Sequence, residues 1–163
     1  MYMNNKNETK YVTNINEISD FFLSKEGVTQ KKLQKLVYYA YAWYITLYND
    51  DIYHIDNMLF DECPEAWVHG PVFKSLYAKY KDYYWKTIPK KNMTFNFNNS
   101  DLESFLNIIW NTFKKYSADE LEFMTHQETP WKKAREGLEP FDSSNKKLDL
   151  KDIFMFYNKL ANE

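Results

Sequence analysis

The segment between residues 30 and 48 constrains the fold most, because apolar residues almost surround its latter half when it is wound as an α-helix. An ordinary surface helix carries one apolar stripe and buries that side alone. Here two stripes occur at helical spacing: Leu33, Leu36, Val37, Ala40, Tyr44 and Leu47 form the first, and Tyr38, Tyr41, Ile45 and Tyr48 form the second. A helix of this kind needs other elements on several of its sides. The segment therefore predicts a central, buried helix with its tyrosines in the core.

Helix-start signals recur along the rest of the chain. A Ser, Thr or Asn followed three residues later by Glu is typical of a capping box, which satisfies free backbone N–H groups at a helix start. Such pairs are Asn14 with Glu17, Ser100 with Glu103, and Ser117 with Glu120. Together with the apolar stripes they predict a mainly α protein, a single compact domain of about six helices with a small β-hairpin. We place this domain at residues 14–163, after a flexible N-terminal tail at residues 1–13.

Two short apolar runs, residues 58–60 and 66–68, predict the hairpin. Pro64 lies between them and is expected at an edge or turn, because proline cannot donate a hydrogen bond to a strand ladder. Gly70-Pro71 then breaks the chain, and we expect a third helix with Pro71 in its first turn. Residues 94–97 alternate between apolar and polar, which predicts an isolated strand.

Composition disfavours several classes of function. The net charge of −2 and the pI of about 6.0 provide no general basic field, so nucleic-acid binding is not expected. No stretch reaches the roughly 20 apolar residues that span a bilayer, so no membrane association is expected. The single Cys63 fits a reducing compartment. We therefore predict a cytoplasmic protein.

Arg135 is the only arginine among the 21 basic residues. A guanidinium forms a planar fork that binds acceptors in pairs and stacks on aromatic rings, which an ammonium cannot do. One interpretation is a buried Arg–carboxylate pair, with Glu128 or another acid as the partner. The alternative is an arginine that binds an anion or takes part in catalysis. Structural ion pairs are the commoner case, so we favour the first.

Other patterns of catalytic or binding residues are weak. The three histidines, His54, His69 and His126, have no spacing typical of a metal site, so no metal is predicted. The whole chain has three glycines, which is few for a glycine-rich phosphate-binding loop. No cofactor is predicted. A general base at His69 or His126 is conceivable at a helix end, but we expect both to satisfy backbone groups.

The run Tyr83-Tyr84-Trp85 follows the third predicted helix and is hard to bury completely. Tyrosine and tryptophan are enriched at protein interfaces, where a large ring and a polar tip are both useful. These three residues are therefore a candidate partner-binding patch. Packing in the core is an equally weighted alternative.

Three segments of the chain together carry a resemblance to a known family. They are Leu33-Gln34-Lys35-Leu36-Val37-Tyr38-Tyr39-Ala40, then Glu65-Ala66-Trp67-Val68-His69-Gly70-Pro71-Val72 with Leu76, Tyr77 and Tyr80, and then Leu121-Glu122 followed by Thr125-His126-Gln127-Glu128-Thr129-Pro130-Trp131-Lys132-Lys133-Ala134-Arg135. In order and separation they resemble the Panacea domain, the SocA-like antitoxin family often found in phages and prophages. The resemblance covers about residues 15–160.

The resemblance implies a mostly helical antitoxin that neutralises a cognate protein toxin by direct contact, with the toxin encoded by a neighbouring gene. Residues that recur in the family correspond here to Trp67, His69, Gly70, Pro71, Tyr77, His126, Glu128, Pro130, Trp131 and Arg135. We interpret them as structural. Gly70-Pro71 is expected to fix the turn into the third helix, and His126, Glu128 and Arg135 to form a buried polar network around Trp131.

Two alternative functions stay open at this point. An enzyme of unknown reaction requires four side chains to meet in one accessible cleft: His69, His126, Glu128 and Arg135. A phage or prophage DNA-binding regulator requires a local basic face. A homodimer is also open, because a helical stripe fits an internal core and a dimer interface equally well.

Overall fold

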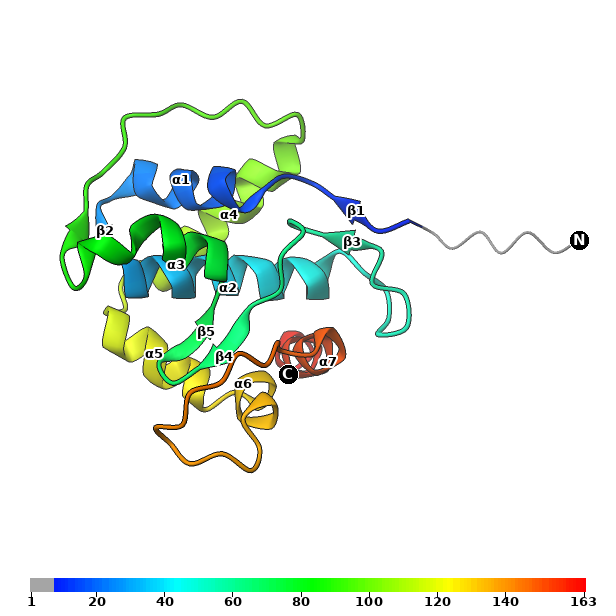
Figure 1. Cartoon of the computed structure of the whole chain (residues 1–163). Coiled ribbons are helices and arrows are strands. Elements are labelled where there is room, and N and C mark those ends of the chain that lie inside the picture. The colour runs from blue at the N-terminus through cyan, green and yellow to red at the C-terminus, as the bar shows by residue number, and fades with distance from the viewer. Residues whose placement is uncertain (1–7) are drawn as a thin grey trace, which may run out of the picture.

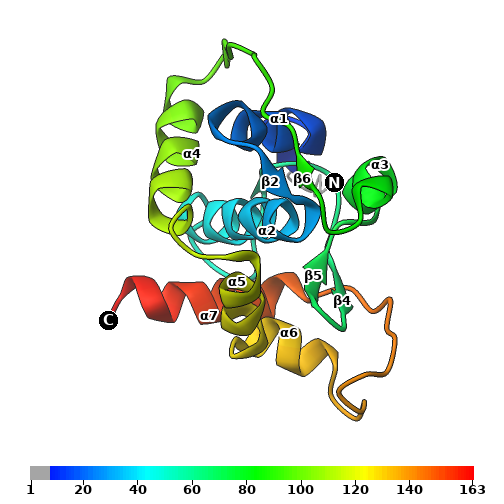
Figure 2. The ribbon, with the colours of Figure 1, turned by 90° about the vertical axis from the view of Figure 1, so that its left-hand side faces the viewer.

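Helix α2 (Gln30–Leu47) lies at the centre of the computed structural model, which describes residues 8–163. Figures 1 and 2 show α1 and α4 on one side of α2, α3 and a small hairpin on another, and α5 and α7 below it. The bounds of these helices and of α6 are α1 Ile15–Lys25, α3 Lys74–Tyr80, α4 Ser100–Phe113, α5 Ala118–His126, α6 Thr129–Ala134 and α7 Leu150–Ala161. Within the described residues these are seven α-helices, so the mainly α prediction is confirmed.

The core forms around α2 because its two apolar stripes are covered along most of their length, up to the exposed Leu47 and Tyr48 at the end of the helix. Leu33 and Leu36 from the first stripe, and Tyr38 and Tyr41 from the second, are completely buried. Apolar side chains from α1, α4 and α7 pack against them. The central helix inferred from the two stripes is therefore confirmed. Within residues 8–163, no helix is both long enough and apolar enough to cross a membrane.

Of the three predicted capping pairs, one forms both of its hydrogen bonds and a second forms one. Asn14 accepts a hydrogen bond from the Glu17 N–H at the start of α1, and Ser117 and Glu120 form a complete capping box at the start of α5. The pair predicted at Ser100 is wrong. Helix α4 begins one residue earlier than expected, and Asn99 caps it by accepting from the Asp101 N–H.

The hairpin exists, but its strands differ from those predicted. It consists of β4 (Glu65–Trp67) and β5 (Gly70–Val72), which pair antiparallel with Trp67 opposite Gly70. Gly70-Pro71 is thus part of a strand and does not start the third helix, which begins at Lys74. Gly70 has a φ of +103°, a conformation that glycine adopts at little cost. Two residues, Val68 and His69, are sufficient for the turn because Gly70 supplies this conformation.

Residues 58–60, which were predicted to be the first strand of that hairpin, do not pair with residues 66–68. Strand β3 (Asn57–Met58) lies parallel to β1 (Lys10–Tyr11), and the hydrogen bonds continue to Thr13. Residues 1–7 of the predicted tail lie outside the described residues, but its end at residues 10–13 belongs to the fold. Strand β2 (Val28–Thr29) pairs antiparallel with β6 (Thr87–Ile88).

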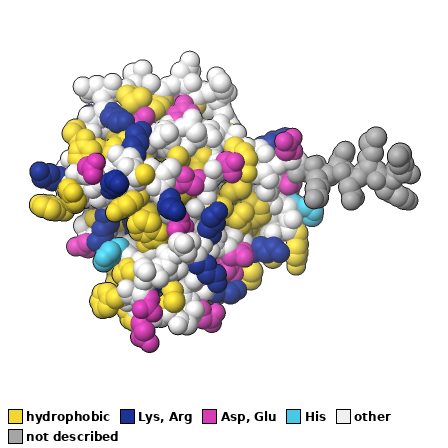
Figure 3. All heavy atoms as spheres, in the orientation of Figure 1, with side chains coloured by type: hydrophobic (Ala, Val, Ile, Leu, Met, Phe, Trp, Pro, Cys, Tyr) yellow, Lys and Arg dark blue, Asp and Glu magenta, His cyan; other side chains and the backbone are white. Residues whose placement is uncertain are grey.

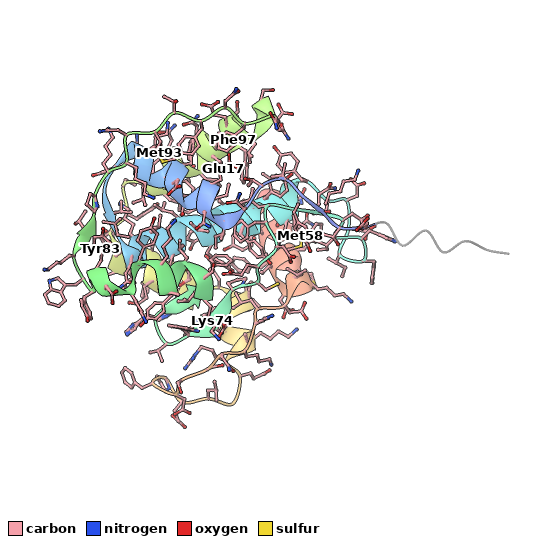
Figure 4. The ribbon with its side chains drawn as sticks, turned by 45° about the horizontal axis from the view of Figure 1, so that its top comes forward. Glu17, Met58, Lys74, Tyr83, Met93 and Phe97 are labelled. Carbon is pink, nitrogen blue, oxygen red and sulfur yellow. The ribbon has the colours of Figure 1, made fainter. Side chains whose placement is uncertain are left out.

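No strand forms at residues 94–97, so that prediction is wrong. Instead, Phe95 and Phe97 both approach the Phe21 ring of α1, with ring centroids at 5.6 and 6.1 Å. The alternating pattern reflects a coil segment that covers the core with two phenylalanines. Figure 4 shows Phe97 in the segment above α1 and α4.

Candidate functional site

Trp131 in α6 brings together two of the residues singled out from the sequence. The His126 imidazole stacks on its indole, with ring centroids 4.0 Å apart and an angle of 19° between the planes. The Arg135 guanidinium carbon lies 5.3 Å from the centre of the Trp131 ring. Burial lowers the pKa of His126, which favours the neutral imidazole in this stack. His126 and Arg135 therefore both pack on Trp131, but no hydrogen bond joins them within the described residues.

Trp131 and Arg135 also hold strand β4 in place. The Trp131 indole N–H donates to the Trp67 carbonyl at 2.9 Å, and Arg135 Nη1 donates to the Ala66 carbonyl at 2.9 Å. Arg135 Nη2 donates to three further carbonyls, those of Glu139, Pro140 and Asp142, of which the last is at 2.6 Å. All of these acceptors are backbone oxygens. The expected Arg–carboxylate pair is wrong, because the guanidinium gathers the carbonyls of β4 and of the loop after α6.

Glu128 precedes α6 at its N-cap position and has other partners than Trp131. Its carboxylate accepts hydrogen bonds from Tyr39 of α2, at 2.7 Å, and from Tyr157 of α7. Burial raises the pKa of Glu128 to about 7, although the hydrogen bonds from Tyr157 and Tyr39 act in the opposite direction. The prediction that Glu128 joins His126 and Arg135 is wrong. It ties α6 to the central helix, which is a separate structural role.

His69 lies at the tip of the hairpin turn and is exposed. Its Nδ1 pairs with Glu122 of α5, and Glu122 also pairs with Lys31 of α2 at 3.1 Å. Lys31 in turn contacts Asp119 at 2.7 Å. The turn is therefore held against α5 and α2 by a small charged network at the surface.

Lys35, which the sequence analysis did not single out, lies beneath the same turn. It belongs to α2 and has only 1% of its surface exposed. Its Nζ donates one hydrogen bond, to the Pro71 carbonyl at 3.2 Å. Burial lowers the pKa of Lys35 to about 7, while attraction to Glu122 opposes that shift. A Cβ at Gly70 would lie 2.6 Å from Lys35 Cε and 2.8 Å from the Thr125 hydroxyl, so only glycine fits over this lysine.

Lys35 contributes to the lining of a surface cavity of about 570 Å³, which we call the aromatic hollow. Trp67, Tyr77, Tyr84 and Trp85 supply its aromatic lining, and His69 and Lys31 are also in its wall. The Tyr77 ring meets Trp67 edge to face, with centroids 4.9 Å apart. Figure 3 shows hydrophobic side chains interspersed with lysines over the face that carries α3 and the hairpin.

Two residues of the candidate patch Tyr83-Tyr84-Trp85, Tyr84 and Trp85, line this hollow. Trp85 is 79% exposed and Tyr84 is 64% exposed, so the alternative of core packing is wrong. Figure 4 places Tyr83 beyond the end of α3, at the opposite end of that helix from Lys74. The patch begins at the last residue of η1 (Lys81–Tyr83), a short 3₁₀ helix that continues α3.

Tyr84 has a strained backbone. Its φ of 53° and ψ of −115° match the first central position of a type II′ turn, which glycine dominates. The turn is closed by a hydrogen bond from the Lys86 N–H to the Tyr83 carbonyl at 2.8 Å. The Gln30 side-chain amide donates to the Tyr84 carbonyl, also at 2.8 Å. The surrounding structure thus holds an aromatic residue where glycine would be unstrained.

The remaining sequence-derived residues are distributed as follows. Pro130 lies in the first turn of α6 and is buried, while Tyr77 is half-exposed at the hollow. The four side chains of the enzyme hypothesis do not share a cleft: His69 is on the surface, His126 and Arg135 pack on Trp131, and Glu128 lies between two tyrosines. Across residues 8–163, no three His, Cys, Asp or Glu side chains are grouped so that they could hold a metal ion.

Comparison with known proteins agrees with the motifs. The model of a protein family described as "Antitoxin SocA-like, Panacea domain" matches residues 33–132. The match contains Trp67, His69, Gly70, Tyr77 and His126, but it is shorter than the expected 15–160 and ends before Arg135. Searches of the curated proteins and of the solved structures found no match.

Proposed function

The chain belongs to the SocA-like antitoxin family with a Panacea domain, and from this premise we propose that it neutralises a cognate protein toxin by direct contact. The proposal places the contact at the aromatic hollow and its edge residues Tyr84 and Trp85. The toxin is expected to be the product of a neighbouring gene.

The observation that carries this proposal is the strained, exposed Tyr84. Holding a residue of this kind in a sparsely populated backbone region costs on the order of 1–3 kcal/mol, and such strain clusters at functional sites. Glycine would remove the cost, so the tyrosine side chain has a use other than stability. Tyrosine and tryptophan dominate interface hot spots, where truncation typically costs more than 2 kcal/mol of binding. Tyr84 and Trp85 beside a hollow fit that pattern.

The test is a growth assay in which the neighbouring gene is induced alone and together with this one, followed by purification of the complex. We expect toxicity that co-expression relieves, and a complex that survives gel filtration. The double variant Tyr84→Ser, Trp85→Ser should lose both rescue and complex. Phe141→Ser is the matched control, because Phe141 is 87% exposed and outside the hollow.

The outcomes separate the function from the surface. A harmless neighbour that forms no complex contradicts the antitoxin function. Rescue that persists in the double variant leaves the antitoxin function standing but moves the contact away from the hollow. Loss of rescue in Phe141→Ser as well would mean that the substitutions act through general effects on the protein.

A further inference from the structure

Apart from the residues that pack on Trp131, Lys35 is the most unusual charged residue of the described chain. Only 1% of its surface is exposed, and it lines the aromatic hollow. Its ammonium nevertheless has a single hydrogen-bond acceptor, the Pro71 carbonyl at 3.2 Å. An ammonium carries three N–H donors. Two of them therefore have no protein acceptor within residues 8–163, and Lys35 is among the residues that line the cavity.

The nearest acid does not neutralise this lysine by contact. Glu122 attracts Lys35 electrostatically, but its two carboxylate oxygens are engaged by His69 and by Lys31. A buried charge without a contacting counter-ion destabilises a fold, and an apolar side chain of similar length is usually the more stable choice. Lys35 thus lowers the stability of the folded protein, and a destabilising buried charge of this kind is typical of a binding residue.

We propose that Lys35 is a carboxylate-binding site, and that an aspartate or glutamate side chain of the partner protein enters the aromatic hollow to pair with it. This inference rests on the proposed function, because the partner is the toxin. The incoming carboxylate supplies the acceptors that Lys35 Nζ lacks, and the aromatic walls cover the aliphatic part of the entering side chain.

The surroundings of the hollow favour an acidic partner. Residues 74–86 supply Tyr77, Tyr84 and Trp85 to its lining, and this segment contains four lysines and one acid: Lys74, Lys79, Lys81, Lys86 and Asp82. Asp119, which lines the hollow, and Glu122 are already paired with Lys31. Charge complementarity of this kind steers a partner and suppresses competitors. Of the two lysines that line the hollow, Lys31 contacts acids, whereas Lys35 contacts none within residues 8–163.

Binding of the partner's carboxylate should be coupled to the uptake of a proton by Lys35. The charged and titratable groups that surround Lys35 are Lys31, His69, Asp119, Glu122 and His126. Because burial already lowers the pKa of Lys35 to about 7, a bound carboxylate must raise it again. Formation of the complex at pH 8 should therefore take up close to one proton, whereas at pH 5.5 the lysine is already charged.

The experiment compares Lys35→Met with Lys32→Met in the full chain, using the purified toxin. Lys32 is the matched control: it lies on the same helix, and its Nζ contacts the Lys114 carbonyl at the surface. We expect Lys35→Met to fold with no loss of thermal stability and to weaken the complex at least tenfold. The control should bind within about twofold of the original chain. Calorimetry at pH 8 in two buffers of different ionisation heat should show the proton uptake disappear in Lys35→Met alone.

A double-mutant cycle identifies the carboxylate. One Asp→Asn or Glu→Gln change in the toxin should reproduce the loss and add nothing to Lys35→Met. Binding of Lys35→Met that equals the original overturns the proposal while the antitoxin function stands, and so does a loss that couples to no acidic residue. If no toxin is found, a titration with acetate decides: the ¹³Cε signal of Lys35 must shift and its pKa must rise, and an unchanged signal overturns the proposal.

Discussion

The Tyr39 hydroxyl donates a hydrogen bond to the Glu128 carboxylate at 2.7 Å, inside the core between the central helix and α6. Tyr157 donates to the other carboxylate oxygen, so the acid has a donor on each oxygen. Even so, burial prevails and raises the pKa of Glu128 to about 7 from its usual 4.5. The core therefore contains an acid that ionises in the physiological range.

The raised pKa of Glu128 predicts a loss of stability as the pH rises. Between pH 4.5 and 7 the folded chain retains a proton that the unfolded chain releases, so folding becomes less favourable as the pH increases. A shift of this size corresponds to about 3 kcal/mol in the free energy of unfolding. Urea denaturation from pH 5 to 7 should show a decline for the original chain. In Glu128→Gln the decline should be absent, and equal slopes for the two proteins would contradict the assignment.

Lys35 predicts the opposite trend above neutrality. Its pKa is about 7 when folded and 10.5 when unfolded, so between these values the unfolded chain holds the additional proton and stability rises with pH. From pH 7 to 9 the free energy of unfolding should increase by about 2 kcal/mol. Lys35→Met should remove this rise and Lys32→Met should retain it. With the Glu128 effect, the original chain should have a stability minimum near pH 7, and a flat profile there would refute both shifts.

Arg135 predicts a stability loss that a lysine cannot repair. Arg135→Lys keeps the positive charge, but one ammonium cannot reach both the Ala66 carbonyl and the loop carbonyls at 139–142. Carbonyls that lose a charged donor cost roughly 1–3 kcal/mol. We expect urea unfolding to register that loss and limited proteolysis to cleave the loop after α6 faster. Stability equal to the original, with lost toxin binding, would instead make Arg135 part of the contact surface.

The central helix could be predicted because its evidence is local. Two apolar stripes within residues 30–48 are enough to require burial on several sides, and no distant residue has to be known. Strand pairing is different, because the partner of a short strand is chosen by packing over long sequence distances. Residues 57–58 pair with 10–11 across more than forty residues, and nothing in the run 58–60 distinguishes that partner from 66–68.

In the candidate site, too, features with local evidence could be predicted and the others could not. Trp131 with His126 and Arg135 could be foreseen from a dense motif, but the direction of the Glu128 side chain could not, since a cap position leaves it free to face either side of α6. Lys35 was missed although a signal existed. It lies in a helix predicted to be covered on several sides, where a lysine has little access to water. The strain at Tyr84 has no signal, because the turn it occupies normally contains glycine.

Gly70 and Gly137 form a matched pair that separates crowding from backbone strain. Both have positive φ values, +103° and +85°, but an alanine Cβ at 70 would meet Lys35 and Thr125, whereas one at 137 meets nothing within 4 Å. Gly137→Ala should cost about 1 kcal/mol from backbone strain alone. Gly70→Ala should cost about 3 kcal/mol, because overpacking is added. Thermal melts of the two variants test this, and equal costs would mean that Lys35 moves aside freely.

Tyr84→Gly separates stability from function at the edge of the hollow. Glycine adopts the backbone conformation of Tyr84 without strain, so removing the tyrosine should raise the free energy of unfolding by about 1 kcal/mol. The side chain lost is 64% exposed, so little core packing is given up. If the toxin contacts this turn, the same variant should bind it more weakly despite being more stable. Tyr84→Ala is the control, since it removes the ring and keeps the strain. It should therefore match the weaker binding without the gain in stability, whereas unchanged binding in both variants would place the contact elsewhere.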